Sequence, residues 1–402
     1  MNVLVVHNFY QQPGGEDQVF RDEVELLRAR GNHVTVFNVH NDAVANLSKL
    51  TVARKTLWND DTYQQVHEIV RREQIEVAHF HNTFPLVSPA AYYAAKDAGA
   101  AVVQTLHNFR LLCPAATFFR DGHVCEECLG RHVTWPSVVH ACYRDSRSAS
   151  AITTAMLAYH RFKGTWHDTV DTYIALTEFA KRKFIEGGLP AQKLLVKPNF
   201  VAPDPGVGPG GGGYVAFIGR LSPEKGISTL VETWTKYVAG RIPLKILGDG
   251  PLRSELNDSV VTNARVEWLG RRAMPEVYAI LGRAEALIFP SLWYEGLPRT
   301  IVESFACGTP VIASDLGSMA ELVRPGKTGQ LFAAGNAAQL ARHLEELLGN
   351  QKLLSDLRLG AREEFLRIYT ADRNYPMLME AYRRARSSTS ASPVVSAAAG
   401  VM

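Results

Sequence analysis

The sequence predicts an α/β protein of two domains, each built on a parallel sheet. Short apolar runs of strand length alternate with longer helical segments along most of the chain, which is the pattern of strand–helix–strand units. The chain has 402 residues, enough for two such domains. A Pro- and Gly-rich stretch at 203–213 interrupts the alternation near the middle, so we place an interdomain linker at 201–213.

The composition is that of an ordinary globular protein and argues against several classes. Hydrophobic residues make up 46% of the chain and charged residues 21%. The net charge of +3, without a basic block, argues against nucleic-acid binding. No apolar run approaches the ~18 residues that span a bilayer. The first residues are too short and too uncharged for a signal peptide, so we expect a cytoplasmic protein, whose five cysteines form no disulfide framework.

The first domain opens with a strand, a loop, a helix and a second strand. We expect strands at Val3–Val6 and Val34–Val39, with a loop from residue 7 to 15 and a helix at about 16–30 between them. Gly14 and Gly15 stand just before the helix, where glycine lets the backbone approach a ligand closely. The dinucleotide fingerprint Gly-x-Gly-x-x-Gly is absent here. A plain strand-to-helix turn is the alternative.

Two histidines follow later strands of this domain. After a polar, mostly helical region at 41–74, strands are expected at 77–81 and 101–106. The first ends in His81 and the second is followed by His107. Because functional residues gather at the carboxyl ends of parallel strands, both histidines are candidates. The alternative for each is a structural hydrogen-bonding role.

Residues 110–166 depart from the strand–helix alternation and contain four of the five cysteines. Cys113, Cys125, Cys128 and Cys142 have the spacing Cys-x11-Cys-x2-Cys-x13-Cys, which suits a tetrahedral thiolate site. A loop-rich segment of this kind gains order from a bound metal. We predict a structural zinc; an iron–sulfur cluster and four unligated thiols are the alternatives. Three nearby histidines are alternate ligands: His123, His132 and His140.

The end of this segment is a predicted helix on which basic and aromatic residues interleave. These residues are Arg144, Arg147, Met156, Leu157, Tyr159, Arg161, Phe162, Lys163 and Trp166. Such a helix either lies on a membrane surface or packs into the core with solvated arginines, and we slightly favour the second. A strand at 171–176, a helix at 178–186 and a closing segment at 194–199 complete a first domain of residues 1–200.

The second domain begins with a strand and two spaced cations. The strand at 214–218 leads into a turn that carries Arg220 and Lys225, followed by a helix. Two cations in such a turn can neutralise a diphosphate without a metal. Further strands are expected at 244–247 and 266–270, and the loop after the second contains Arg271.

The stretch 290–313 forms the next strand–loop–helix–strand unit and carries two glutamates. Glu295 falls in the loop and Glu303 in the helix, with seven residues between them. Pro298 suits the first turn of that helix, whose N-terminus favours phosphate. Carboxylates beside a phosphate site are expected to bind hydroxyls and to face the cleft, so the unit indicates a sugar nucleotide. Two solvated glutamates in an ordinary crossover are the alternative.

The remaining chain is mostly helical. A turn and strand are expected at 326–332, and helices at about 337–348, 352–367 and 373–386. The Ser- and Ala-rich tail from residue 387 is expected to be disordered.

Together these motifs resemble the retaining glycosyltransferases of family four, which have the GT-B fold. The resemblance covers nearly the whole chain and includes the Glu-x7-Glu pair, Arg220, Lys225, the Gly-Gly loop and His107. It implies two Rossmann-like domains facing each other across a cleft. The second would occupy 214–370, and a terminal helix at 371–386 would cross back to the first.

The resemblance also implies an activity. It implies transfer of a sugar from a nucleotide diphospho-sugar, such as a UDP-sugar, to a glycan, lipid-linked glycan or small-molecule acceptor, in cell-surface polysaccharide biosynthesis. No catalytic metal is expected, and no Asp-x-Asp is present. An acceptor on a lipid would bring the protein into peripheral contact with the cytoplasmic face of the membrane. The rival readings are an inactive partner or scaffold and a GT-B epimerase.

The site residues follow from the same resemblance. The catalytic set it implies is His107, Glu295, Arg220 and Lys225. The donor-binding set is Gly14, Gly15, Arg220, Lys225, Arg271, Glu295, Gly296, Leu297, Pro298 and Glu303. Glu303 would bind the ribose hydroxyls, and Glu295 would lie by the transferred sugar together with His107. Similar cysteine-bearing segments occur in polysaccharide-assembly members of the family.

Overall fold

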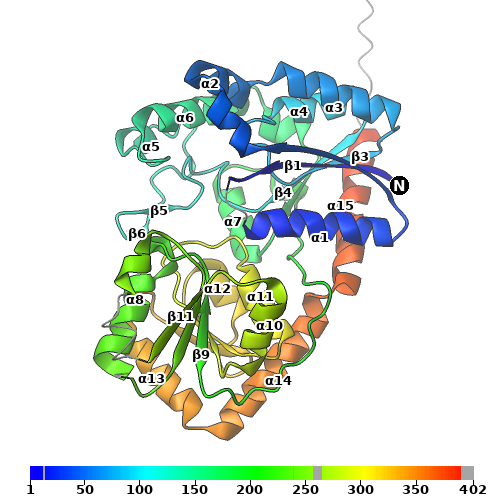
Figure 1. Ribbon diagram of the computed structural model, residues 1–402. Coiled ribbons are helices and arrows are strands. Elements are labelled where there is room, and N and C mark those ends of the chain that lie inside the picture. The colour runs from blue at the N-terminus through cyan, green and yellow to red at the C-terminus, as the bar shows by residue number, and fades with distance from the viewer. Residues whose placement is uncertain (12–13, 239, 257–264, 391–402) are drawn as a thin grey trace, which may run out of the picture.

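Two six-stranded parallel sheets form the cores of the upper and lower halves of the molecule (Figure 1). The computed structural model describes residues 1–11, 14–238, 240–256 and 265–390. The expected α/β class is confirmed, with one sheet built from each half of the chain. None of the helices in these ranges is long and apolar enough to cross a membrane.

The first sheet has the strand order β2-β1-β3-β4-β7-β8. Its strands are β1 (Asn2–Phe9), β2 (His33–His40), β3 (Val77–Phe80), β4 (Ala101–Leu106), β7 (Thr172–Ala175) and β8 (Leu194–Val196). The main helices around it are α1 (Gly15–Ala29), α2 (Lys49–Leu57), α3 (Asp60–Arg72), α4 (Ala90–Asp97), α6 (Arg147–Phe162) and α7 (Glu178–Glu186). Because β1 continues to Phe9, the loop before α1 is shorter than expected, and residues 12 and 13 of that loop lie outside the described ranges.

The side chains of β1 explain why both faces of this sheet are covered. Leu4 and Val6 pack into a core shared with α3 and α4, whereas Val3 and Val5 pack against α1. Alternation with a period of two is the geometry of a strand, and an all-apolar strand therefore buries both faces. In Figure 1, α3 and α4 lie above the sheet and α1 lies below it.

The second sheet has the strand order β11-β10-β9-β12-β13-β14. Its strands are β9 (Val215–Ile218), β10 (Leu244–Leu247), β11 (Val266–Gly270), β12 (Leu287–Phe289), β13 (Val311–Ser314) and β14 (Gly329–Phe332). The helices around it include α8 (Ile227–Glu232), α10 (Met274–Arg283), α11 (Arg299–Ala306), α12 (Gly317–Leu322), α13 (Ala337–Leu348) and α14 (Gln351–Ile368). In each sheet the crossovers run outward from inner strands, which leaves a crevice at the carboxyl edge.

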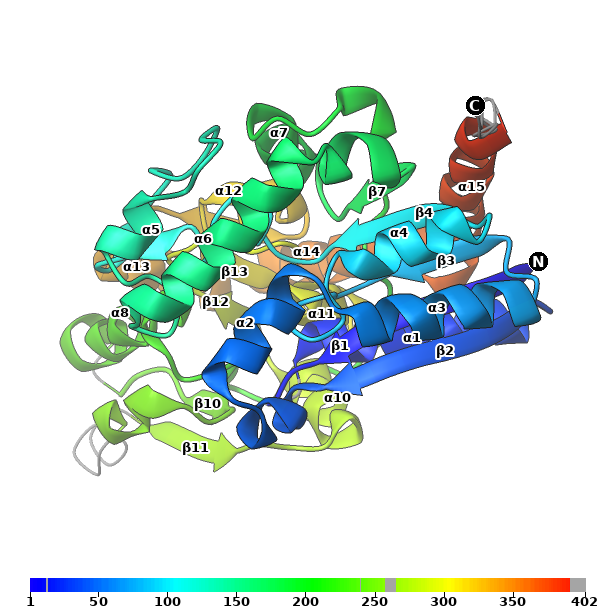
Figure 2. The ribbon, with the colours of Figure 1, turned by 90° about the horizontal axis from the view of Figure 1, so that it is seen from above.

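The segment with four cysteines interrupts the first domain after β4. It contains a two-stranded antiparallel hairpin of β5 (Phe119–Arg120) and β6 (His123–Val124), then the short helix α5 (Pro136–Val139) and α6. Figure 2 shows α5 and α6 beside α2 at one end of the molecule. Regular structure is sparse before α6, as the Gly- and Pro-containing sequence predicts.

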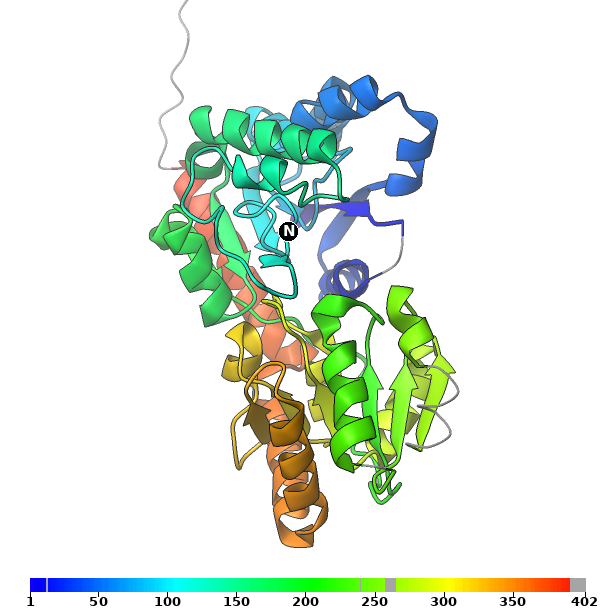
Figure 3. The same cartoon turned by 90° about the vertical axis from the view of Figure 1, so that its left-hand side faces the viewer.

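The helix α15 (Ala371–Ser390) leaves the second domain and packs on the first sheet (Figure 3). Leu378, Ala381, Tyr382 and Ala385 are buried there beside Val3 and other residues of that sheet. The expected returning helix is confirmed. The expected disordered tail from residue 387 is wrong for residues 387–390, which continue the helix. Residues 391–402 lie outside the described ranges.

Candidate active site

A cavity of about 640 Å³ lies between the two domains at the carboxyl edge of the second sheet. Gly14 and Gly15 line it from the first domain, at the start of α1. The loops after β9, β10 and β11 and the first turns of α11 line it from the second domain. The Cβ that would extend from Gly15 lies 4.0 Å from the Cβ of Arg299, so the two domains meet closely at this edge.

The wall of this cavity is strongly cationic. Its basic residues are Arg21, Arg220, Lys225, Arg271, Arg272 and Arg299, and its acidic residues are Asp249 and Glu303. An excess of cations in a walled cleft attracts and holds an anion such as a diphosphate. The predicted residues Arg220, Lys225, Arg271 and Glu303 are thus brought together with the Gly-Gly loop around one space.

Glycine backbone forms part of the same wall. Gly248 has φ +135°, and a Cβ there would lie 1.9 Å from the carbonyl oxygen of Gly219. Only glycine therefore allows the ends of β9 and β10 to approach each other at the cavity. On the opposite wall, the Gly14 N–H donates to Oδ2 of Asp17 (2.9 Å), and Oδ1 of Asp17 contacts Nε2 of the buried His7 (2.7 Å). This pairing fixes the start of α1 at the cavity.

Glu295 is held by Lys225 behind the cavity wall. The Lys225 Nζ lies 2.6 Å from Glu295 Oε1, and the Ser291 hydroxyl donates to the same oxygen at 2.8 Å. Glu295 is only 6% exposed and does not line the cavity, whereas Lys225 does. Glu295 therefore lies behind the cavity wall as the buried partner of the lysine, and its predicted place beside the transferred sugar stays a prediction.

Glu303 is also paired with a cation. Arg299, one helical turn earlier on α11, donates from Nε to Glu303 Oε1 (2.7 Å) and from Nη1 to Asp22 of α1. Glu303 lines the cavity but is 5% exposed, so it faces the core as much as the cleft. Burial raises the pKa of Glu303, and the neighbouring Arg299 opposes that rise. The Arg299 guanidinium thus joins Glu303, the second glutamate of the Glu-x7-Glu pair, to the other domain.

The loop that carries Glu295 and leads into α11, here called the signature loop, lies against the first domain. A Cβ on Gly296 would lie 2.4 Å from the carbonyl oxygen of His107, so the glycine permits this contact. Leu297 is buried in the core of the second domain, and Pro298 caps α11 instead of entering its first turn. Neither side chain lines the cavity, and Gly296 does not line it either. These three residues position the signature loop, whereas other residues form the cationic wall of the cavity.

His107 is joined to His81. Nε2 of His107 lies 2.9 Å from Nδ1 of His81, and both line a small pocket of about 50 Å³ on the first domain. Burial and the neighbouring His81 hold the pKa of His107 well below its usual value, so its imidazole is neutral. The two histidines singled out from the sequence are therefore direct neighbours, and His107 reaches the signature loop through Gly296.

Glu16 was missed by the sequence analysis, which used it only as the start of a helix. It accepts hydrogen bonds from the Tyr10 hydroxyl (3.3 Å) and the Asn108 amide (3.2 Å), next to His107. Its Oε1 is buried with no hydrogen-bond partner among the described residues. Burial, followed by the adjacent Asp17, raises the pKa of Glu16 to about 8. The position of this carboxyl group directly after the Gly-Gly loop is the feature of the sequence that could have identified Glu16 as a site residue.

A second buried cluster lies deeper in the first domain. Ligand atoms of Glu23, His79 and His81 all lie within 4.8 Å of one another. Glu23 is ion-paired with the buried Lys197, and His79 contacts the hydroxyl of Tyr382 on α15 at 2.9 Å. These partners make it a hydrogen-bonded network that ties α15 to the sheet.

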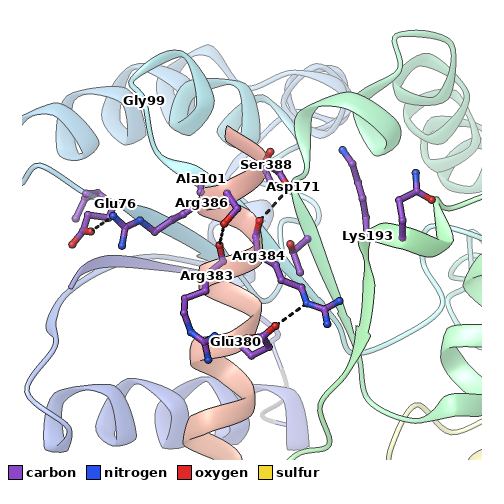
Figure 4. Close-up of a pocket in the computed structure, with 14 residues that line it drawn as sticks. Glu76, Gly99, Ala101, Asp171, Lys193, Glu380, Arg383, Arg384, Arg386 and Ser388 are labelled. Atoms are coloured by element: carbon purple, nitrogen blue, oxygen red, sulfur yellow. Dashed lines mark hydrogen bonds and ion pairs between the residues drawn. The ribbon is translucent and has the colours of Figure 1, made fainter. Parts of the chain in front are cut away.

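A larger cavity lies at the opposite edge of the first sheet. It has a volume of about 1070 Å³ and lies by the amino ends of β3, β4 and β7, beside the end of α15 (Figure 4). Its charges pair with each other: Arg384 with Glu380 at 2.9 Å and Arg386 with Glu76 at 3.0 Å. Parallel sheets bind ligands at the carboxyl edge, so the smaller interdomain cavity is the better candidate.

Two family models match the chain in succession. A model described as "Glycosyltransferase Family 4" matches residues 13–205, and one described as "Glycosyl transferases group 1" matches residues 206–364. A phosphatidyl-myo-inositol mannosyltransferase of Mycobacterium leprae is 30% identical over 61% of this chain and 68% of its own length. A D-inositol 3-phosphate glycosyltransferase of Rhodococcus erythropolis is 33% identical over 42% of this chain and 41% of its own. The aligned stretches thus span less than half of some relatives.

Solved structures share the fold across almost the whole chain. The Anabaena protein HepE, in complex with UDP, has a TM-score of 0.65 at 18% identity and covers 94% of this chain and 99% of its own. The sucrose-phosphate synthase of Thermosynechococcus elongatus has a TM-score of 0.71 at 15% identity and covers 96% and 99%. The overall fold is therefore common to these proteins and this chain.

Proposed function

The chain belongs to the group 1 glycosyltransferases of family four, with the GT-B fold, and from this premise we propose that it is a retaining glycosyltransferase. It moves a sugar from a nucleotide diphospho-sugar to a glycan, lipid-linked glycan or small-molecule acceptor in cell-surface polysaccharide assembly. The single observation that carries the proposal is the cationic interdomain cavity, with Arg220, Lys225, Arg271 and Glu303 in one wall.

We assign the donor to the second-domain side of this cavity. Arg220, Lys225 and the first turn of α11 hold the diphosphate, because two side-chain cations and unpaired helix N–H groups all favour that anion. Arg271 lies at the base, and Glu303 at the ribose. The proteins with bound UDP or UDP-glucose among the fold relatives support UDP as the nucleotide.

The chemistry follows from where negative charge develops. As the bond between the sugar and the diphosphate breaks, charge grows on the leaving diphosphate, and fixed cations stabilise it without a metal. Lys225 is held in place for this by Glu295 and Ser291. The diphosphate oxygen takes the proton of the acceptor hydroxyl, and the neutral His107 contacts the transferred sugar. This arrangement supports same-face substitution.

The acceptor belongs on the first-domain side, next to His107. The small pocket there is also lined by Asn108, Arg110 and Thr83, which offer polar contacts to a sugar. Nearby, α5 and α6 carry exposed apolar residues, with Trp135 53% and Phe162 73% exposed. We include peripheral contact with a membrane carrying a lipid-linked acceptor in the proposal, since such residues enter the interface.

The expected basic and aromatic helix is divided between the core and this exposed surface. Met156, Leu157 and Trp166 are buried in the first domain. Arg161 donates hydrogen bonds to backbone carbonyls, including that of Arg131 at 2.6 Å. Phe162 and Tyr159 alone of the aromatic residues predicted there are exposed.

The test is a thermal-shift panel of nucleotide diphospho-sugars. A ligand that binds only the folded state raises the melting temperature, so the true donor gives a concentration-dependent rise. Arg220→Ala should abolish the rise. Lys236→Ala, which removes a cation whose partner Glu232 lies on the surface of the same domain, is the control and should retain it. No rise with any donor would contradict the donor assignment.

Turnover separates the enzyme from the scaffold. With the best donor and acceptor extracts, protein treated with a chelator under conditions that leave a structural zinc in place should still transfer sugar. Nuclear magnetic resonance of the product should show the donor's anomeric configuration. Binding without any transfer would favour an inactive partner. Strict dependence on magnesium or manganese would contradict neutralisation by side-chain cations alone.

A further inference from the structure

We propose that Cys113, Cys125, Cys128 and Cys142 bind one structural Zn²⁺. The four thiols come from three separate turns, yet all of them line a single cavity of about 20 Å³. Four cysteine sulfurs around one small space are the donor set of a closed zinc site. The transfer reaction uses none of these residues, so this site is distinct from the donor cavity.

The backbone around each thiol explains how they converge. Cys113 ends a turn whose N–H bonds to the carbonyl of Phe109 (2.9 Å), and Cys125 follows β6, with its N–H on Phe118 (2.8 Å). Cys128 lies one turn further along. Cys142 comes after α5, and its N–H bonds to Ser137 at 2.9 Å. The β5–β6 hairpin and α5 therefore fold the two ends of the segment back onto each other.

The size of the cavity suits a single ion. A space of about 20 Å³ is close to that of one water-sized probe, which is about 10–15 Å³. One Zn²⁺ fits a space of this size. The four cysteines are separate thiols in the structure and form no disulfide with each other.

Binding requires the thiols to draw inward. Zn–S bonds of about 2.3 Å in a tetrahedron place the sulfurs about 3.8 Å apart. The sulfurs are spread more widely than the ligand atoms of Glu23, His79 and His81, which all lie within 4.8 Å.

Charge at the site also suits a thiolate-bound cation. Four thiolates and one Zn²⁺ carry a net charge of −2. Arg120 and Glu127 both line the same cavity and pair with each other (2.7 Å), and the guanidinium of Arg120 can offset part of this charge.

The metal would stabilise a surface that touches the signature loop. Glu126, between two of the cysteines, pairs with Lys183 at 2.8 Å. The ring of Phe118 packs on Tyr294 with centroids 6.1 Å apart, and Tyr294 directly precedes Glu295. The zinc segment therefore supports the loop from the first-domain side and takes a positioning role, not a catalytic one.

Metal analysis tests the site directly. Protein purified without added zinc should contain about one equivalent of zinc per chain and no stoichiometric iron. Cys125→Ser and Cys128→Ser should each lose the metal, while Cys307→Ser is the matched control and should retain it, because Cys307 is buried in the other domain. Less than a tenth of an equivalent in the parent protein, or iron with sulfide, would overturn the proposal.

A second measurement covers variants that fail to fold. When the parent protein is titrated with an organomercurial, the zinc released should be proportional to the number of thiols modified. The release should be complete when four thiols per chain have reacted, and the melting temperature should fall. Cobalt added in place of zinc should give the visible absorption of tetrahedral cobalt thiolate. Zinc that stays bound after these thiols react would place the metal elsewhere. Metal content does not depend on turnover, so this result is independent of the proposed transferase activity.

Discussion

The two signature glutamates show how individual side chains are used at this site. From the sequence, both are expected to bind hydroxyl groups of a donor and to face the cleft. In the structure each is nearly buried and paired with a cation, Glu295 with Lys225 and Glu303 with Arg299. A buried charge is tolerated when it is paired and hydrogen-bonded. Each glutamate therefore sets the position of a cation, and any contact with donor hydroxyls comes in addition.

Variants of Lys225 and Glu295 should affect the stability of the protein and the rate of the reaction differently. Lys225→Ala leaves Glu295 buried without its cation, so the melting temperature should fall and kcat/KM should drop on the order of 10²-fold, the size seen when one preorganised charge partner is lost. Adding Glu295→Gln removes the unpaired charge. The double variant should recover part of the melting temperature but none of the rate. If the loss of melting temperature in the double variant equals the sum of the losses in the two single variants, the two side chains are not coupled.

Glu16 should make stability fall as pH rises. Its pKa of about 8 in the folded protein exceeds the ordinary value of 4.5. Between these two pH values the unfolded chain loses the proton while the folded protein keeps it, so folding is progressively penalised from about pH 4.5 to pH 8. Glu16→Gln removes this penalty and should melt higher than the parent at pH 8, with a smaller gap at pH 5. If the melting temperatures of Glu16→Gln and the parent protein differ by the same amount at every pH in this range, the assignment is contradicted.

Much of the site was predictable at the level of residues, but its pairing was not. Arg220, Lys225, Arg271 and Glu303 line one cavity, as their motifs indicated. Arg299 was not singled out, although its spacing of four from Glu303 on a helix was visible. Its second partner, Asp22, is 277 positions away, and no local pattern reports a contact of that separation.

At the level of elements, periodicity predicted most helices and strands. The helix α13 begins and ends where its apolar pattern does, and the strand β4 was found at Ala101–Leu106. Strands buried on both faces gave continuous apolar runs that are easy to recognise. The end of α15 was the main error, because serine and alanine are compatible both with a disordered tail and with a helix.

The face of α15 on the first sheet should carry a large share of stability. Leu378 is fully buried between this helix and the strands, so Leu378→Ala should cost about 2–5 kcal/mol, the range for removing a buried leucine side chain. Met377, its neighbour, is 37% exposed and is the matched control; Met377→Ala should cost less than about 0.5 kcal/mol. Denaturant unfolding measures both, and equal losses would mean that α15 packs differently.

At the level of the whole molecule, the two domains are joined across the cleft by a charged contact. Arg299 on α11 binds Asp22 on α1, and both side chains are nearly buried. Buried pairs resist screening by salt more than surface pairs do. The contact therefore helps to set how far the donor cavity is open.

Asp22→Asn should open the molecule. It removes the negative partner but leaves Arg299 paired with Glu303, so small-angle scattering should show a larger radius of gyration than in the parent protein. Asp372→Asn is the control, because Asp372 pairs with Arg30 between exposed side chains and such pairs contribute little. If both variants scatter like the parent, the cross-domain pair does not hold the domains together.

The helix α15 also constrains the order in which the chain folds during synthesis. The first 200 residues leave the ribosome early, yet one face of their sheet is covered only in part, by α1, until Leu378, Tyr382 and Ala385 have emerged. The second domain draws its core from residues 215–369 together with the earlier Leu176 and Val201, and needs no late segment of that kind. Domains usually complete their folding in the order of synthesis. Here every core residue of the second domain is synthesised before Leu378, so the second domain can complete its core before the first domain does.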